Sequence, residues 1–196
     1  AMQALPALPG DHNAQNVASA YAVVSAILND RSAESLAQIT AAIADFPGLA
    51  HRQELLGTSG AVKFVNDSKA TNAEAAAHAL AAYDNIYWIA GGIAKDGGIT
   101  ALEPLFERVR HAFLIGAAAE DFADTLRDRV PATISGDLQT ALVQATNMAD
   151  GEAVILLAPA CASFDQYTSF DARGDAFRDA VSNIPGFVFH TAGGAA

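Results

Sequence analysis

The chain has 196 residues, 52% of them hydrophobic, which is enough for one domain of ordinary size or for one domain with an appended segment. Its formal net charge of −11 leaves no diffuse basic surface for phosphate groups, and its single cysteine excludes an internal disulfide. Neither a signal peptide nor an apolar run of the ~18 residues needed for a membrane span is recognisable. We therefore expect a cytoplasmic protein that binds neither nucleic acid nor membrane.

Residues 1–47 predict a helical hairpin. Between Asp11 and Asn29, apolar side chains recur at steps of 4, 3 and 4 residues, which is typical of one face of a capped helix. A second apolar stripe begins after Ser32 and stops at Pro47-Gly48. The two stripes consist of Val17, Tyr21, Val24 and Leu28, then Leu36, Ile39, Ile43 and Phe46. Two short helices bury little between them, so we expect an appendage or part of a larger domain, with a boundary at Pro47-Gly48.

Beyond this boundary, patterns typical of strands and helices alternate. Strands are predicted for residues 53–58, 61–66, 86–90, 112–115, 132–134, 153–157 and 187–189, and helices for residues 72–83, 102–109, 117–126, 138–148 and 170–181. Apolar strands that alternate with helices indicate a parallel sheet covered on both faces. For residues 48–196 we therefore predict an α/β, Rossmann-like fold with a mostly parallel sheet.

Polar or glycine-rich segments follow several predicted strands. The most polar, residues 66–72, offers a carboxylate, an ammonium group and two hydroxyls, and the others are residues 91–98, 116–120 and 159–166. Because the carboxyl ends of parallel strands share one edge of a sheet, we expect these segments to converge on an anion-binding site. The chain has few cations for such a ligand, since its 11 basic residues are eight arginines and the three lysines Lys63, Lys69 and Lys95.

The motifs of several common sites are absent. Residues 91–98 match neither Gly-x-x-x-x-Gly-Lys-Ser/Thr nor Gly-x-Gly-x-x-Gly, so they are not expected to hold ATP phosphates or a dinucleotide, and a flexible loop with a solvated Lys95 stays an alternative. Ser163 does not stand in the Gly-x-Ser-x-Gly motif that holds the nucleophilic serine of hydrolases, and it is interpreted as a hydrogen-bond donor or as a helix N-cap. Cys161 is interpreted as a packing residue. The five histidines have no ligand spacing, so no metal site is predicted.

Taken together, these segments resemble the C-terminal part of the D-glutamate-adding ligases of the Mur ligase family. The resemblance covers nearly the whole chain and rests on Asn-Asp-Ser-Lys-Ala-Thr-Asn at residues 66–72, Phe-Pro-Gly-Leu-Ala-His-Arg-Gln-Glu at 46–54, Gly91-Gly92 with Lys95, and Leu-Ala-Pro-Ala-Cys-Ala-Ser-Phe-Asp-Gln at 157–166 before Phe170 and Arg173-Gly174-Asp175. It implies a three-domain enzyme of peptidoglycan synthesis that uses ATP and Mg²⁺. Such an enzyme activates UDP-N-acetylmuramoyl-L-alanine as an acyl phosphate, which the amine of D-glutamate attacks.

The resemblance also implies roles for individual residues. Lys69 is expected to be catalytic and to face the reacting phosphate and amine. Among ATP contacts, Asp67 is expected at the ribose, Arg52 at the phosphates, and Asn13 and Asn16 near the adenine. The D-glutamate pocket is expected to consist of Thr71, Lys95, Ser163 and Phe170, with Lys95 as the cation for the acidic side chain and Ser163 as a donor to a carboxylate.

Residues 1–47 then correspond to the helical tail of a central ATPase domain, and residues 48–196 to the C-terminal domain. The phosphate loop, the magnesium-binding carboxylates and the UDP-binding domain of such enzymes have no counterpart in the sequence. We therefore expect a monomer that needs the missing N-terminal and central domains, with no ligase activity and no cofactor of its own. Two alternatives stay open: the corresponding domain of another Mur-type or folylpolyglutamate-type ligase, and a stand-alone small-molecule-binding module.

Overall fold

The computed structural model describes residues 11–30 and 32–190, which fall into two compact units. The first unit lies within residues 11–48, and the second comprises residues 49–190. Among the described residues, no helix has both the length and the apolar character that crossing a membrane requires.

Two helices, α1 (Asp11–Leu28) and α2 (Ala33–Ala44), make up the first unit. Ser32 caps α2, because its hydroxyl accepts a hydrogen bond from the Ser35 N–H at 3.2 Å. Of the described residues in this unit, Ser35 and Ile39 are buried, whereas Ile27 is 76% exposed. The predicted hairpin is therefore present, and it has little core of its own.

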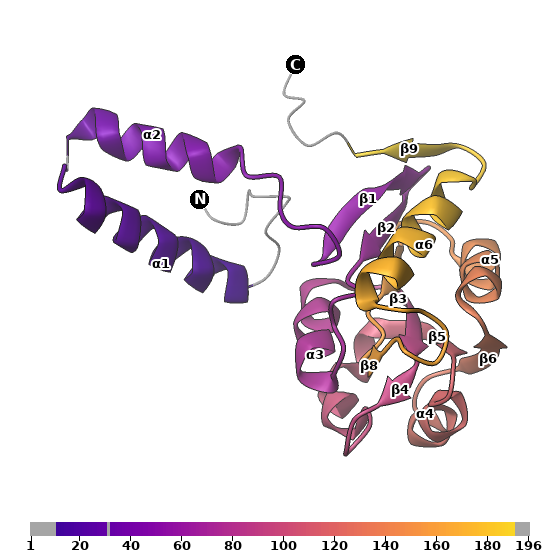
Figure 1. Ribbon diagram of the computed structural model, residues 1–196. Helices are drawn as coiled ribbons and strands as arrows, with labels where there is room; N and C mark the ends of the chain where they lie inside the picture. The colour runs from indigo at the N-terminus through magenta and orange to yellow at the C-terminus, as the bar shows by residue number, and fades with distance from the viewer. Residues whose placement is uncertain (1–10, 31, 191–196) are drawn as a thin grey trace. The chain divides into compact units, whose positions relative to one another are not determined.

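Seven strands form the main sheet of the second unit, in the order β6-β5-β3-β7-β2-β1-β9. Figure 1 shows β9 and β6 at opposite ends of this order. The strands from β6 to β2 run parallel, while β1 pairs antiparallel with β2 and with β9. The strands are β1 (Glu54–Ser59), β2 (Val62–Asn66), β3 (Ile86–Gly91), β5 (Val109–Ile115), β6 (Ala132–Gly136), β7 (Val154–Leu157) and β9 (Phe187–Phe189). The predicted mostly parallel α/β sheet is confirmed.

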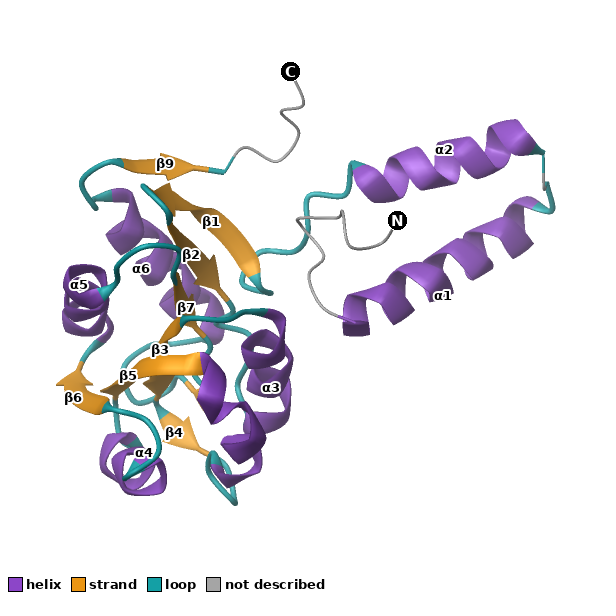
Figure 2. Ribbon diagram, turned by 180° about the vertical axis from the view of Figure 1, so that it is seen from behind, coloured by secondary structure: helices purple, strands orange, loops and turns teal. Residues whose placement is uncertain are grey.

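Successive side chains of the central strands divide between two cores, one on each face of the sheet. In β3, Trp88 and Ala90 belong to one core, and Tyr87 and Ile89 belong to the other. Helices α3 (Ala73–Ala82) and α4 (Ala119–Leu126) and the 3-10 helix η2 (Thr100–Arg108) cover the first core, and α5 (Leu138–Met148) and α6 (Phe170–Ser182) cover the second. Figure 2 shows α3 on one side of the sheet and α5 and α6 on the other. Helices on both faces are thus confirmed.

Two local features add to the sequence prediction. Residues 100–108 form a 3-10 helix rather than an α-helix, in keeping with Pro104, which has no N–H to donate inside a helix. The two-residue strands β4 (Ile93–Ala94) and β8 (Cys161–Ala162) pair antiparallel in a separate ribbon. Strands this short have no periodicity to detect. The ribbon ties the segment after β3 to the segment after β7.

Candidate functional site

The segments that follow the parallel strands converge at one edge of the sheet. Asp67 N–H donates to Leu157 O at 2.8 Å, and Gly91 N–H donates to Pro159 O at 2.9 Å, which links the ends of β2, β3 and β7. Because β1 is antiparallel, its first residue pairs with the last residue of β2, so residues 51–53 lie at the same edge. The segments that follow these strands therefore lie together, as the strand pattern predicts.

Asp67 is almost completely buried at this edge, with 6% of its surface exposed. Its carboxylate accepts a hydrogen bond from the Gln53 N–H at 3.2 Å. Burial raises the pKa of this carboxyl from 3.8 to about 7, although the hydrogen bond from Gln53 and the positive charge of Arg52 both favour the ionised form. Asp67 therefore changes charge near neutral pH.

The loop that carries Arg52 has a strained backbone. His51 and Gln53, on either side of Arg52, have φ angles of +61° and +45°, a backbone region that residues other than glycine rarely adopt. The loop after β2 supports both residues, because His51 O accepts a hydrogen bond from the Lys69 N–H at 3.0 Å and Asp67 binds the Gln53 N–H. The exposed Arg52 is thereby presented between two fixed neighbours.

The His51 imidazole is buried between β2 and α6. Asn66 Nδ2 donates to His51 Nδ1 at 3.0 Å, which assigns the ring proton to Nε2, 3.5 Å from Asp175 Oδ1. Asn66 Nδ2 also donates to Gly174 O at 3.1 Å. A Cβ atom at Gly174 would lie 2.2 Å from His51 Nδ1, so this helical position requires glycine. This packing adds a further support to the strained loop.

Lys69 and Phe170, which were assigned to catalysis and to the amino-acid pocket, are in contact. Lys69 Nζ lies 3.9 Å from the centroid of the Phe170 ring, in a cation–π arrangement. The neighbouring Ser68 Oγ donates to Phe170 O at 2.7 Å. The loop after β2 and the first turn of α6 are thus joined through both side chain and backbone.

Arg173, which belongs to the family motif but has no predicted role, lies at the centre of this cluster. It is 1% exposed, and its guanidinium donates to Ser68 Oγ at 3.0 Å, to Ser68 O at 2.9 Å and to Cys161 O at 3.1 Å. Nη1 has no hydrogen-bond partner among the described residues. Burial lowers the pKa of Arg173 to about 10, so the group stays charged at neutral pH. An arginine on a helix is normally at the surface, and only its motif context could have indicated this position.

Ser163 lies directly after β8 and is 2% exposed. Its hydroxyl has no hydrogen-bond partner within the described part of the chain. The N-cap of α6 is Ser169, whose Oγ accepts from the Ala172 N–H at 3.1 Å, so the alternative that Ser163 caps this helix is wrong. Because buried hydroxyls are nearly always satisfied, Ser163 Oγ is a candidate donor to a bound ligand.

Thr71 and Lys95 flank the cluster. Thr71 is half-buried and precedes Asn72, which caps α3 by accepting from the Ala75 N–H at 2.8 Å. Lys95 is exposed and follows β4, whose Ala94 pairs with Cys161. The β4–β8 ribbon therefore connects the segments that carry Lys95 and Ser163.

Cys161 behaves as a packing residue, as expected. The side chain is fully buried in the core under α3 and α4, and burial raises the pKa of its thiol to about 12. Within residues 11–30 and 32–190, no three histidine, cysteine, aspartate or glutamate side chains form a group suited to a metal ion.

The predicted nucleotide contacts come from both units. Asn13 and Asn16 lie on α1 in the first unit, where Asn16 Nδ2 donates to Asn13 Oδ1 at 3.3 Å. In the second unit, Asp67 offers an acceptor suited to a ribose hydroxyl, and Arg52 offers a cation suited to phosphate.

Comparisons with known proteins agree on a single family. The family profile described as "Mur ligase, glutamate ligase domain" matches residues 51–161. The chain is 53% identical over 180 residues to the UDP-N-acetylmuramoylalanine–D-glutamate ligase of Caulobacter sp. (strain K31), covering 90% of this chain and 37% of that protein. It is 50% identical over 184 residues to the ligase of the same name from Paramagnetospirillum magneticum, covering 92% and 39%.

Structural similarity supports the same fold. The chain superposes on the UDP-N-acetylmuramate-alanine ligase MurC of Thermotoga maritima with a TM-score of 0.62 at 14% identity, covering 87% of this chain and 38% of that one. The chain therefore spans about two fifths of the length of these relatives.

Proposed function

This chain belongs to the Mur ligase family, as the sequence motifs indicated, and we propose that it is the amino-acid-binding part of an ATP-dependent ligase that adds D-glutamate to UDP-N-acetylmuramoyl-L-alanine in peptidoglycan synthesis. The observation that carries the proposal is the hydrogen-bonded cluster at the carboxyl edge of the sheet, which joins Lys69, Phe170 and the segment before Ser163 through Arg173. Two relatives that are 53% and 50% identical to this chain over 180 and 184 aligned residues bear the name of this activity.

The chemistry of the cluster suits an acidic amino acid. Ser163 supplies a buried hydroxyl to one carboxylate, Lys95 supplies a cation to the other, and Thr71 adds a second hydroxyl at the margin. The chain has a net charge of −11 and three lysines, and two of those lysines, Lys69 and Lys95, belong to segments at this edge. These two lysines offer local cations to the carboxylates of an acidic amino acid.

A nucleotide is proposed to contact the same edge on the side of Arg52 and Asp67. ATP, when bound, supplies the phosphoryl group that activates the substrate carboxylate. Lys69 is proposed to offset the negative charge that develops as the amine attacks. Magnesium ligands are proposed to lie in the part of the longer ligase that this chain does not contain.

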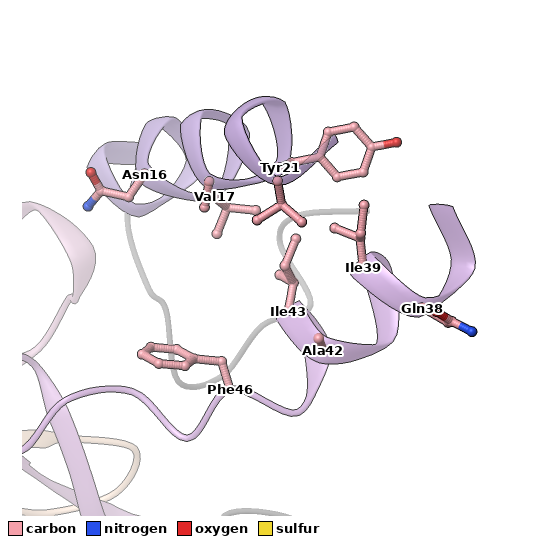
Figure 3. Close-up of a pocket in the computed structure, with 10 residues that line it drawn as sticks. Asn16, Val17, Tyr21, Gln38, Ile39, Ala42, Ile43 and Phe46 are labelled. Carbon is pink, nitrogen blue, oxygen red and sulfur yellow. The ribbon is translucent and has the colours of Figure 1, made fainter. Parts of the chain in front are cut away.

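The hairpin of the first unit is proposed to pack on that remaining part, as the tail of its central ATPase domain. Between α1 and α2 lies an apolar cavity of about 460 Å³, lined by Asn16, Val17, Ala20, Tyr21, Val24, Gln38, Ile39, Ala42, Ile43 and Phe46. Figure 3 shows Val17, Ile39 and Ile43 directed into the space between the helices, and the polar end of Gln38 directed away. Exposed side chains such as Ile27 and Leu28 extend this apolar surface. Because the chain spans about two fifths of the length of its relatives, the remaining three fifths of such a ligase are proposed to cover this surface.

Calorimetric titration of the chain with D-glutamate, L-glutamate and meso-diaminopimelate tests the pocket. We expect D-glutamate to bind best, and Lys95→Ala to weaken its binding about tenfold by removing a cation–carboxylate contact. Lys63→Ala, which removes an exposed lysine on β2, is the matched control and should leave binding unchanged. A preference for meso-diaminopimelate would point to another Mur-type ligase, and binding that survives Lys95→Ala would exclude the role of Lys95.

Reconstitution tests the place of the chain in the whole enzyme. We expect no ATP-dependent joining of D-glutamate by the chain alone, and activity when it is joined to the remaining part of a ligase of this name. Val24→Asp should impair that assembly, because Val24 lines the hairpin cavity, whereas Ala26→Asp, at an exposed position outside the cavity lining, should not. Full ligase activity of the isolated chain would contradict the proposed division of labour.

A further inference from the structure

The guanidinium of Arg173 connects segments that are far apart in the sequence. Its three hydrogen bonds reach the loop after β2 at Ser68 and the strand β8 at Cys161, from a position on α6. Ser68 extends the network by donating from its hydroxyl to Phe170 O, one turn before Arg173 on the same helix. One buried side chain therefore holds three chain segments in register.

Each of these segments carries residues of the proposed pocket. Ser68 stands between Asp67 and Lys69, and Phe170 begins α6 beneath the Lys69 ammonium. Cys161 is two residues before Ser163 and pairs with Ala94, which precedes Lys95. None of the three groups that accept a hydrogen bond from Arg173 is itself a proposed ligand contact.

A guanidinium is suited to this task for geometric reasons. It is planar and carries five N–H donors in a fixed fork, so it can serve an acceptor pair on one segment and a carbonyl on another at the same time. A lysine ammonium in the same place is a single point that reaches fewer of these acceptors. The charged and titratable groups that act on Arg173 are Cys161, Asp165 and Tyr167.

We infer that Arg173 is a positioning residue of the amino-acid pocket, which sets the placement of Lys69, Phe170 and Ser163 by tying Ser68 to Cys161. The identity of the ligand rests on the proposed function, whereas the positioning itself does not. Loss of the guanidinium releases the β4–β8 ribbon from the loop after β2. The pocket residues then remain in the chain but no longer face a ligand together.

The test uses the whole 196-residue chain and the variants Arg173→Met, Arg173→Lys and Arg129→Met. Because Cys161 is the only cysteine, an aromatic disulfide reagent reports on its burial alone. The ring-current shift of the Lys69 side-chain protons, measured by NMR, reports on the Lys69–Phe170 contact. Arg129 forms an exposed ion pair with Glu103 and is the control for removing an arginine.

We expect thiol reaction about tenfold faster in Arg173→Met, an intermediate rate in Arg173→Lys, and an unchanged rate in Arg129→Met, because local opening governs access to a buried group. The Lys69 shift should disappear in Arg173→Met and return in part in Arg173→Lys. The inference is overturned if Arg173→Met reacts at the wild-type thiol rate and keeps the wild-type Lys69 shift. If the methionine variant does not fold, the same result in Arg173→Lys overturns it. Titration with D-glutamate then separates the two proposals. If the wild-type chain does not bind D-glutamate, the proposed ligand is wrong, but the positioning role of Arg173 is unaffected.

Discussion

The Asp67 carboxylate accepts a hydrogen bond from the Gln53 N–H at 3.2 Å, across the hairpin of β1 and β2, although the two residues are 14 positions apart. The bond connects the strained loop that presents Arg52 to the loop that carries Lys69. Because Asp67 is buried, its protonation affects both loops.

Replacing Asp67 by asparagine should change how stability depends on pH. The folded state binds a proton at Asp67 up to about pH 7, whereas the unfolded chain releases it near pH 3.8. The contribution of Asp67 to the free energy of unfolding is therefore fully present below pH 3.8 and is lost as the pH rises through 7. The free energy of unfolding of Asp67→Asn, relative to that of the wild type, should therefore rise by about 4 kcal/mol as the pH is raised from 4 to 8. Urea unfolding at both pH values measures the difference.

Asp137→Asn is the control for the Asp67 prediction. The pKa of Asp137 is lowered by hydrogen bonds from Thr140, so its stabilising contribution is lost only as the pH falls into the acid range. Between pH 5 and pH 8 this variant should parallel the wild type. If the free energy of unfolding of Asp67→Asn also followed that of the wild type across this pH range, Asp67 would be ionised throughout the range.

Gly174→Ala should destabilise the second unit. The added Cβ would lie 2.2 Å from His51 Nδ1, so the imidazole or the helix must shift, at a cost of about 1–3 kcal/mol in the free energy of unfolding. In a His51→Ala background the same substitution should cost less than about 0.5 kcal/mol, because the clashing ring is gone. Equal costs in both backgrounds, measured by urea unfolding, would place the strain elsewhere.

The two units should unfold in separate steps. Trp88, the only tryptophan, is fully buried in the second unit, so its emission reports that unit alone. Circular dichroism also reports α1 and α2, which bury little. We expect the dichroism to begin its transition at lower urea concentration than the tryptophan emission, and Ile39→Asp to shift only the early phase. Coincident transitions would contradict this separation.

Lys69 should matter for turnover if the chain is part of the proposed ligase. Lys69→Met removes the cation from the proposed site, and we expect kcat to fall about 100-fold, as when one preorganised stabiliser of developing charge is lost. Lys69→Arg keeps a cation over the Phe170 ring and should recover part of the loss. Lys63→Met, which removes the exposed lysine of β2, should leave kcat unchanged. Steady-state kinetics that show an unchanged kcat for Lys69→Met would refute the assignment.

Much of the fold could be predicted from the sequence because its signals are local. The helix over residues 138–148 was predicted with its observed bounds, since Asp137 caps a regular apolar pattern. The polar segment at residues 66–72 is predicted as a site for the same kind of reason, because it ends an apolar run. The ribbon of β4 and β8 was missed, because two paired residues leave no periodic trace.

Local patterns were enough to predict the alternation of strands and helices, the hairpin of the first unit and the polar segments that follow the strands, since each depends on neighbours within a few positions. Only the folded chain shows that Arg173 is buried, that Asp67 binds the Gln53 N–H, and that Gly174 makes room for His51. Desolvation and hydrogen bonding depend on atoms that distant segments bring together, and those atoms meet only when the sheet has assembled.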